Sequence, residues 1–352
     1  MSGRWLIYGA TGYTGRLVVQ EAVRRGLAPV LAGRDASRLV DLARPLGLET
    51  RVAPLDDPRA LARALDGIQV VLNAAGPFSS TAPPVSAACL SAHSHYLDVT
   101  GEIPVFQALH QLDGAARDCG ILLLPGAGFI VIPSDCLAAH VAGRLPGAHW
   151  LRLGISRSVL VSRGSARTMM ELLDSGAHIR RDGRLDSLAW DRLDRSIDFG
   201  EGPRSALVVS WADVFTAYHT TGIPNIEACL EVGPWERLSF QNSRQFAWLL
   251  RTTPWKMAIE NQLAFLPEGP SAADRARDRR TLVAVVGDAS GRVAMSRLRT
   301  PEAYTFTAAA AVECVRRVLE GKVKGGFQTP SGLFGADFVL SFAGVERVDV
   351  VV

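Results

Sequence analysis

The sequence predicts an α/β protein whose first part is a doubly wound parallel sheet and whose second part is an α+β domain with a mixed sheet. Short apolar stretches alternate with amphipathic stretches over the first third of the chain, as strands and helices alternate in such sheets. Several apolar stretches end in glycine-containing turns, which a parallel sheet gathers at its carboxyl edge, where ligands bind. The length of 352 residues predicts two domains.

The first strand and helix are joined within W-L-I-Y-G-A-T-G-Y-T-G, from Trp5 to Gly15. A short apolar strand ends here and a helix with one apolar face follows. Glycines in such a turn let the backbone approach a pyrophosphate, and the N–H groups of the helix start favour its negative charge. The spacing is G-x-x-G-x-x-G rather than the commoner G-x-G-x-x-G. The residues expected to bind a dinucleotide here are Gly9, Thr11, Gly12, Tyr13, Thr14 and Gly15.

The elements that follow continue the same alternation. Strands are expected at residues 29–32, 50–53, 69–73, 95–99 and 121–124, and helices at residues 36–46, 58–65, 84–92 and 106–120. Right-handed crossovers between parallel strands would build a Rossmann domain over residues 1–132.

Arg34 ends the second predicted strand, about 20 residues past the glycine turn, and indicates which cofactor binds. NAD-binding folds usually place Asp or Glu here to accept from the ribose 2′-hydroxyl, whereas Arg pairs with a 2′-phosphate. NADP(H) is therefore expected in preference to NAD(H). In the alternative, Asp35 is the ribose acceptor and Arg34 is a surface charge. Arg16 is a second candidate for a phosphate contact.

Turns after the fourth, fifth and sixth strands complete the expected cofactor site. Small residues after the fourth strand leave room for the ribose and the diphosphate, and the loop after the fifth strand approaches the nicotinamide in this fold. The expected contacts are Asn73, Ala75, Gly76, Pro77 and Phe78, then Thr100 and Gly101, and Gly128 after the sixth strand.

These motifs follow one another as G-A-T-G-Y-T-G, A-G-R-D, N-A-A-G-P-F, H-Y-L-D-V-T-G-E and P-G-A-G-F…P-S-D. Together they resemble the saccharopine dehydrogenase-like reductases, and specifically the bacterial branch that includes trans-acting enoyl reductases. H-T-T-G-I-P-N-I-E from His219 to Glu227, and G-F-Q-T-P-S-G-L-F-G-A-D-F from Gly326 to Phe338, extend the resemblance over most of the chain. The resemblance implies a Rossmann domain, an α/β substrate domain and a nicotinamide cofactor, and it leaves the substrate open.

One position departs from the pattern of that family. The family usually reads G-F-D before P-S-D, and here Ile130 stands at the position of the Asp. The loop follows the sixth strand, near the expected nicotinamide, so the loss of a carboxylate indicates a more apolar substrate or an altered proton route. Asp135 is expected to cap a helix that begins near Cys136, with Ser134 as the competing cap.

A reductase needs a proton donor as well as a hydride donor. Tyr96 and Asp98 alternate onto one side of the fifth predicted strand and are candidates, although a buried tyrosine with a structural role is the commoner case. Tyr218 and His219 are the other candidates, and histidine has the pKa that best suits neutral pH.

The second domain is expected over residues 133–352. Strands are expected at 150–156, 206–211, 281–288 and 292–299, and helices at 136–144 and 301–319. The last segment, 326–352, is expected to pack either on this domain or back on the Rossmann domain. The family resemblance puts G-S-A-R-T, residues 164–168, near the substrate, with an ordinary helix cap as the alternative.

Residues 235–266 concentrate the aromatic side chains of a chain in which such residues make up 7%. Phe246, Ala247, Leu249 and Leu250 can share one face of a helix. The segment fits a lid over an apolar substrate, a homodimer face or a contact with a membrane surface, and core packing is the plainest alternative.

Composition excludes several classes of protein. The net charge of +3 is too small to indicate nucleic-acid binding. Five scattered cysteines without C-x-x-C indicate reduced thiols in a cytoplasmic protein. We expect no signal peptide and no membrane-spanning stretch. His93 and His95 form H-x-H without an apparent third ligand, so no metal is expected.

The sequence therefore predicts an NADPH-dependent oxidoreductase that transfers hydride to an activated C=C (enoyl) or C=N (imine) bond of an apolar small molecule. The alternative is a non-catalytic NADP(H)-binding scaffold or sensor protein, because no proton donor stands out.

Overall fold

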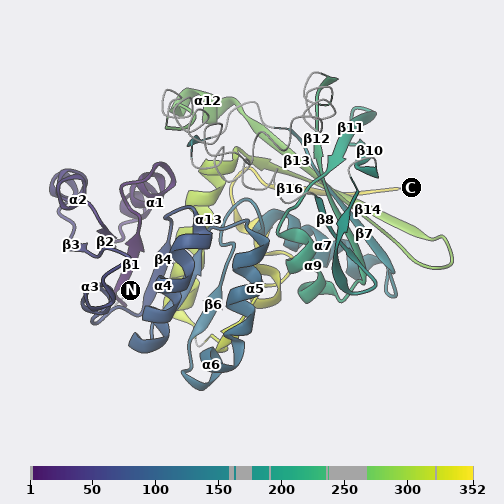
Figure 1. Ribbon diagram of the computed structural model, residues 1–352. Helices are drawn as coiled ribbons and strands as arrows, with labels where there is room; N and C mark the ends of the chain where they lie inside the picture. The colour runs from purple at the N-terminus through teal and green to yellow at the C-terminus, as the bar shows by residue number, and fades with distance from the viewer. Residues whose placement is uncertain are drawn as a thin grey trace, which may run out of the picture. The chain divides into compact units, whose positions relative to one another are not determined.

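The computed structural model in Figure 1 describes residues 3–157, 162–163, 177–189, 192–234, 237, 268–321 and 323–351. The chain divides into two compact units, one of Met1–Ile132 with Ala303–Gly335 and one of Pro133–Glu302 with Ala336–Val352. The G-S-A-R-T segment and, apart from Arg237, the aromatic segment 235–266 lie outside the described residues.

The first unit is built on a seven-stranded sheet with strand order β15-β6-β5-β4-β1-β2-β3. All of its pairings are parallel, which confirms the predicted doubly wound sheet. The order reverses between β1 and β4, and ligands bind at such a switch point. The strands are β1 Trp5–Tyr8, β2 Val30–Gly33, β3 Thr50–Val52, β4 Val70–Asn73, β5 His95–Asp98, β6 Leu122–Leu124 and β15 Gly326–Phe327.

Helices cover both faces of this sheet. In Figure 1, α4 and α5 lie over one face and α13 lies over the other. The helices are α1 Tyr13–Arg24, α2 Ala36–Ala43, α3 Pro58–Ala64, α4 Phe78–Ala92, α5 Ile103–Gln111, α6 Asp113–Asp118, α13 Ala303–Glu320 and α14 Pro330–Phe334, with a 3₁₀ turn η1 Arg44–Leu46. Because both faces are covered, the central strands are mostly apolar, and Leu6, Ile7 and Leu72 have no exposed surface.

The prediction placed residues 133–325 in the second domain and left 326–352 open to either domain, whereas in the structure Ala303–Gly335 belongs to the first unit. Helix α13 packs along α1, and β15 pairs with β6 in the first sheet. The small residues of α13, such as Ala310 and Ala311, are fully buried. A helix with such a face can approach its neighbour closely, so the chain returns to the first unit after completing most of the second.

The second unit contains a nine-stranded mixed sheet with the main order β10-β11-β12-β7-β13-β14-β16, and β8 and β9 pair beside β12. Its strands are β7 Trp150–Ile155, β8 Ala177–Arg181, β9 Arg184–Leu188, β10 Asp194–Asp198, β11 Pro203–Val208, β12 Asn225–Glu231, β13 Arg279–Gly287, β14 Val293–Pro301 and β16 Glu346–Val350. Its helices are α7 Ile132–Arg144, α9 Asp213–Thr221 and α12 Ala272–Arg277, with a 3₁₀ turn η3 Phe338–Ser341.

Several of these elements were not predicted from the sequence. Strands β8, β9, β10 and β12 and helix α9 carry charged residues that interrupt the apolar alternation, for example Arg181, Arg184 and Asp186. Arg180 is buried although it carries a charge. Patterns of apolar residues could not reveal these strands because they pair through their backbones.

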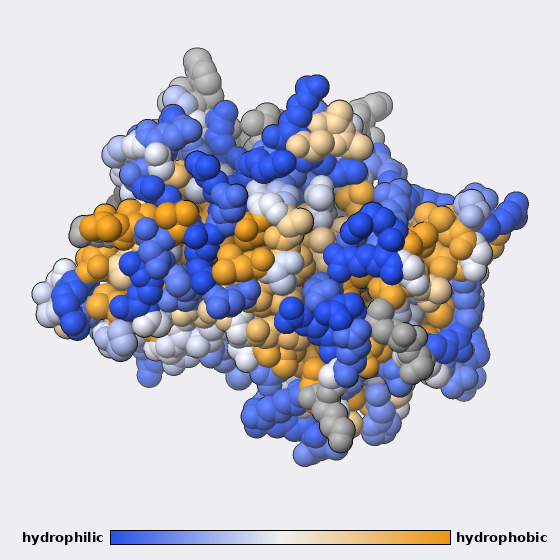
Figure 2. Space-filling model, turned by 180° about the vertical axis from the view of Figure 1, so that it is seen from behind, coloured by the Kyte–Doolittle hydropathy of each residue, from blue (hydrophilic) through white to orange (hydrophobic). Residues whose placement is uncertain are grey.

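The face of the molecule in Figure 2 carries hydrophobic patches separated by hydrophilic residues. Among the described residues, the large hydrophobic side chains that are exposed are Val40, Leu46, Val52, Val293, Leu340, Val348 and Val351. No helix in the described part of the chain combines the length and the apolar composition needed to cross a membrane.

Candidate functional site

The three glycines of the turn after β1 have different roles. Gly9 has φ +79°, and a Cβ there would lie 2.7 Å from the Cβ of Ala75. A Cβ on Gly15 would lie 2.2 Å from the Gly9 carbonyl oxygen, so this glycine lets α1 pack against the turn. A Cβ on Gly12 would lie 3.3 Å from the Gly9 carbonyl oxygen, and apart from its chain neighbours no other atom of the described residues would lie within 4 Å of it. Gly12 is exposed, so its missing side chain leaves room for a ligand.

The start of α1 is arranged to receive an anion. Gly12 is the N-cap residue, and it has no side chain that could accept from the first N–H groups of the helix. The first turn carries no acidic residue. The N–H groups and the positive end of the helix dipole therefore favour a phosphate beside Thr11, Tyr13 and Thr14.

The end of β2 separates the roles of Arg34 and Asp35. The Asp35 carboxylate caps α2, accepting from the Arg38 N–H at 3.1 Å and from the Ser37 hydroxyl at 2.9 Å. These bonds lower the pKa of Asp35. Arg34 is exposed and makes no hydrogen bond or ion pair with the residues described. Burial raises the pKa of Tyr8 to about 12, and the nearby charge of Arg34 opposes this rise.

The turn after β4 forms the other side of the switch point. The Asn73 side chain is buried and accepts from the Ala75 N–H at 3.0 Å, so it shapes the turn. Gly76 is exposed. Phe78 begins α4, and its N–H donates to Glu102 Oε1 at 3.0 Å. The carboxylate of Glu102 therefore accepts from an N–H group at the start of α4. The start of α1 has no side-chain cap and no acidic residue in its first turn.

A buried polar chain joins the ends of β4 and β5. Asn73 Nδ2 donates to the Tyr96 hydroxyl at 3.3 Å, and this hydroxyl donates to Asp98 Oδ2 at 2.8 Å. Asp98 Oδ1 accepts from the N–H groups of Thr100 and Gly126, both at 2.9 Å. Tyr96, Asp98 and Thr100 have no exposed surface. Burial raises the pKa of Asp98 to about 7 and that of Tyr96 well above its ordinary value.

This placement argues against proton donation by Tyr96 or Asp98. Each group is buried, and its hydrogen-bonding capacity is used to hold neighbouring strand ends together. The interpretation of Tyr96 as a structural tyrosine agrees with this geometry. Thr100, expected at the cofactor, is likewise buried and accepts from the Glu102 N–H at 3.1 Å.

Gly101 and Gly128 lack side chains because protein atoms occupy the space. A Cβ on Gly101 would lie 2.6 Å from Cγ2 of Ile130. Ile130, which stands where the family has Asp, therefore packs against the β5 loop. A Cβ on Gly128 would lie 2.9 Å from Cγ2 of Thr307. The structure thus gives both glycines a packing role.

Helix α13 brings two residues to this edge that the sequence did not single out. The Phe129 N–H donates to Thr307 Oγ1 at 3.0 Å. The rings of Tyr13 and Tyr304 meet edge to face with centroids 5.1 Å apart. Tyr13 follows Gly12 at the glycine turn, so the start of α13 lies beside the turn at which the diphosphate is expected to bind. No local pattern could have shown this, because nearly 300 residues of chain separate the two tyrosines.

The other candidate donors lie near the end of α9 in the second unit. Tyr218 is half-buried, and the guanidinium carbon of Arg180 lies 4.0 Å from the centre of its ring. Arg180 donates to the carbonyls of Val214 and Gly183 at 2.8 and 2.7 Å. His219 is exposed, and its ring centroid lies 4.5 Å from that of Phe215.

Two buried carboxylates connect α7 and α9. Helix α7 begins at Ile132 rather than near Cys136, so Asp135 lies in its first turn and accepts from the Thr220 hydroxyl at 2.7 Å. Asp213 is fully buried, and neither carboxylate oxygen has a hydrogen-bond partner of good geometry among the described residues. Burial raises the pKa of Asp213 to about 7, the Ser134 hydroxyl lowers it and the Asp135 charge raises it.

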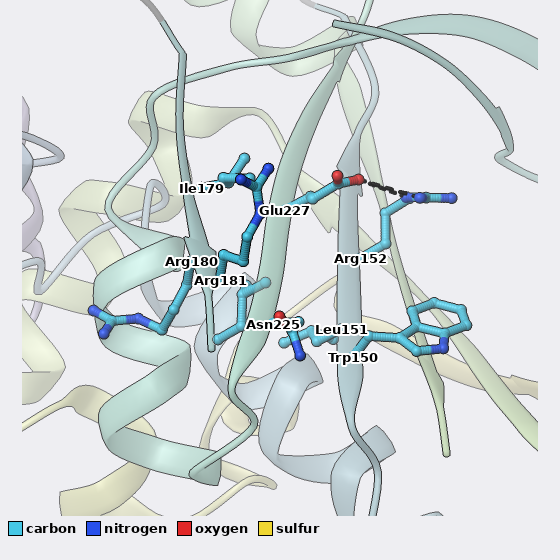
Figure 3. Close-up of a pocket in the computed structure, with 9 residues that line it drawn as sticks. Trp150, Leu151, Arg152, Ile179, Arg180, Arg181, Asn225 and Glu227 are labelled. Carbon is cyan, nitrogen blue, oxygen red and sulfur yellow. Dashed lines mark hydrogen bonds and ion pairs between the residues drawn. The ribbon is translucent and has the colours of Figure 1, made fainter. Parts of the chain in front are cut away.

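A cavity of about 180 Å³ lies on the second unit beside β7, β8 and β12. In Figure 3, Trp150 and Arg152 lie on one side of the strands and Arg180 points the other way. Glu227 pairs with Arg152 at 3.1 Å and with Arg195 at 2.6 Å. Burial raises the pKa of Glu227, but these two arginines hold it below its ordinary value. The carboxylate of the cavity is therefore already neutralised.

The two histidines of H-x-H have separate partners. His93 Nδ1 lies 3.3 Å from the Cys119 carbonyl oxygen, and His95 Nδ1 accepts from the Leu122 N–H at 2.9 Å. Within the described ranges, no three His, Cys, Asp or Glu side chains are grouped to hold a metal ion.

Comparisons with known proteins agree with this geometry. An NAD(P)H-binding family model matches residues 9–98. The probable mitochondrial saccharopine dehydrogenase-like oxidoreductase of Arabidopsis thaliana is 33% identical over 147 residues, covering 37% of this chain and 32% of that protein. The trans-acting enoyl reductase of Mycobacterium bovis is 33% identical over 138 residues, covering 37% of this chain and 33% of that protein. The matched segments thus span about a third of each curated relative.

The similarity of fold extends further than the similarity of sequence. Apo saccharopine dehydrogenase (L-Glu forming) of Saccharomyces cerevisiae superposes with a TM-score of 0.65 at 11% identity, covering 99% of this chain and 100% of that one. The predicted resemblance to saccharopine dehydrogenase-like proteins is therefore confirmed, by sequence over about a third of the chain and by fold over nearly all of it.

Proposed function

We propose that this chain, which carries an NAD(P)H-binding domain and the saccharopine dehydrogenase fold, is an NADPH-dependent oxidoreductase. The proposal depends on two observations at the ends of β1 and β2. Gly12 leaves space at an uncapped helix start, and Arg34 stands without a partner among the described residues while Asp35 is engaged as a helix cap.

The residues present fit a dinucleotide phosphate. The first N–H groups of α1, next to Gly12, would hold the diphosphate. Arg34 would pair with a 2′-phosphate, because its guanidinium matches phosphate in charge and geometry. The exposed turn at Gly76 would border the ribose on the β4 side. When bound, the nicotinamide would supply the hydride.

The substrate we propose has an activated C=C or C=N bond. A hydride adds to one atom of that bond and a proton adds to the other, so an acid must reach the second atom. Tyr218 and His219 have accessible side chains, in contrast to Tyr96 and Asp98, and they are our candidates for this acid. Ile130 in place of a carboxylate supports an apolar substrate. The names of the mycobacterial relatives support the enoyl alternative.

A second function is a non-catalytic NADP(H)-binding scaffold or sensor. The observation that favours it is the burial of Tyr96 and Asp98, because two of the four candidate proton donors are then out of reach of a substrate. For either function we propose a cytoplasmic protein with reduced cysteines that forms a homodimer. The five cysteines are free thiols.

The first test is titration of the purified protein with NADPH and with NADH, followed by nicotinamide fluorescence, in the wild type and in Arg34→Ala. We expect tighter binding of NADPH in the wild type and loss of this preference in the variant. Turnover of enoyl or imine substrates by the NADPH-bound protein would then separate an enzyme from a scaffold. If neither nucleotide binds at millimolar concentration, the proposal is wrong.

A further inference from the structure

Arg38 lies beside the glycine turn although it belongs to the next helix. It is the third residue of α2, and its own N–H is fixed by the Asp35 cap at 3.1 Å. Its side chain runs back past the helix start, as helical side chains do, and Nη2 donates to the Thr11 carbonyl at 3.3 Å. The guanidinium thus bridges the start of α2 and the turn after β1.

Two guanidinium groups converge on this one carbonyl. Arg16 Nη1 donates to the same Thr11 oxygen at 2.7 Å from the α1 side. Arg34 follows β2 and directly precedes Asp35, which caps the helix that carries Arg38. Like charges that are gathered in this way repel one another, and a dianion placed among them relieves the repulsion.

We propose that Arg34 and Arg38 together bind the phosphate monoester on the ribose of an adenine nucleotide, with Arg38 as a specificity-determining residue. The inference rests on the proposed function, which assigns this phosphate contact to Arg34 alone. Arg38 is preorganised for it, because the Asp35 cap fixes its backbone and Thr11 orients its guanidinium.

Two sources can supply such a phosphate. NADP(H) carries it at the 2′ position, and the adenosine of coenzyme A carries it at the 3′ position. Adenosine 2′,5′-bisphosphate, adenosine 3′,5′-bisphosphate and 5′-AMP are small probes that separate these sources. They also avoid any dependence on the nicotinamide or on a substrate.

The experiment measures dissociation constants of the three probes by calorimetry for the full chain and for Arg34→Ala, Arg38→Ala and Arg44→Ala. Arg44 is an exposed arginine at the opposite end of α2, so Arg44→Ala is a control that loses the same charge. We expect Arg38→Ala to weaken the 2′,5′-bisphosphate by at least 10-fold with 5′-AMP unchanged, and Arg44→Ala to change neither. Unfolding curves check that each variant keeps the fold.

The outcomes distinguish the inference from the proposed function. If the wild type prefers the 2′,5′-bisphosphate to 5′-AMP and Arg38→Ala keeps that preference, the role of Arg38 is refuted while the NADP(H) proposal stands. If the wild type binds the 2′,5′-bisphosphate no better than 5′-AMP, the NADP(H) preference itself is wrong. A preference for the 3′,5′-bisphosphate would overturn the NADP(H) source and assign the contact to a coenzyme A adenosine.

Discussion

Replacing Gly12 or Gly15 by alanine should have opposite consequences, although both glycines belong to one turn. A Cβ on Gly12 would lie 3.3 Å from the Gly9 carbonyl oxygen, which a small adjustment relieves. Its backbone, with φ −72° and ψ 166°, is open to any residue. A Cβ on Gly15 would lie 2.2 Å from the same oxygen and 2.9 Å from Cα of Ala10. Backbone atoms cannot move aside as a flexible side chain can.

The expected magnitudes follow from these distances. Gly15→Ala gains up to about 1 kcal/mol of helix propensity but forces backbone apart, so we expect a net loss of about 1–3 kcal/mol in the free energy of unfolding. Gly12→Ala should cost less than about 1 kcal/mol, the difference between glycine and alanine at an N-cap. Its methyl group would occupy the space proposed for the diphosphate. Losing one or two charge-assisted hydrogen bonds there costs about 3 kcal/mol, or roughly 100-fold in affinity.

Urea unfolding and NADPH fluorescence titration measure the two effects separately. Gly12→Ala should unfold close to the wild-type midpoint and bind NADPH poorly, whereas Gly15→Ala should unfold earlier. NADPH affinity that survives in Gly12→Ala would refute the placement of the diphosphate. Wild-type stability in Gly15→Ala would refute the packing role of that glycine.

Three further substitutions test buried polar groups, each by urea unfolding. Asp213 has a pKa of about 7 in the folded protein and about 4 when unfolded, so its ionisation should lower the free energy of unfolding as pH rises from about 4 through 7. Asp213→Asn should remove this pH-dependent loss and raise the free energy of unfolding by as much as ~4 kcal/mol at pH 8. An unchanged dependence of stability on pH would contradict the raised pKa of Asp213. Thr307→Val keeps the shape but leaves the Phe129 N–H without its acceptor, so we expect a loss of about 1–3 kcal/mol that Thr307→Ser does not show. Asp98→Ala removes the acceptor of three hydrogen bonds and should cost about 3 kcal/mol or more at pH 6, whereas a near-neutral effect would mean that this polar chain does not hold the strand ends.

Local patterns were sufficient for the first half of the dinucleotide-binding unit. The apolar strands, the glycine turn and Arg34 lie within about 30 residues of one another, so spacing alone placed them at one sheet edge. Predicted boundaries were less accurate: α4 begins at Phe78 rather than near residue 84, and its first N–H groups donate to the distant Glu102. A cap supplied from another loop leaves no signal in the helix itself.

The roles of individual residues depended more strongly on the tertiary structure. The sequence suggested Tyr96 and Asp98 as proton donors, and the fold buries both side chains in a chain of hydrogen bonds. Gly101 and Gly128 were predicted to contact the cofactor, and in the structure the side chains of Ile130 and Thr307 occupy the space beside them. Sequence spacing reports which residues share an edge of a sheet, but it does not report what packs against them.

The sequence by itself determined the class of the first unit, its sheet edge and the residue types that favour a dinucleotide phosphate, because those signals are periodic and short-range. Only the tertiary structure decided that Asp35 is a helix cap, that Arg38 reaches Thr11, and that α13 returns to flank the glycine turn. The contacts of Arg38 and of α13 join elements that are distant in the chain. A sequence pattern does not reveal such a contact, because the contact stabilises the protein only after folding has brought both partners together.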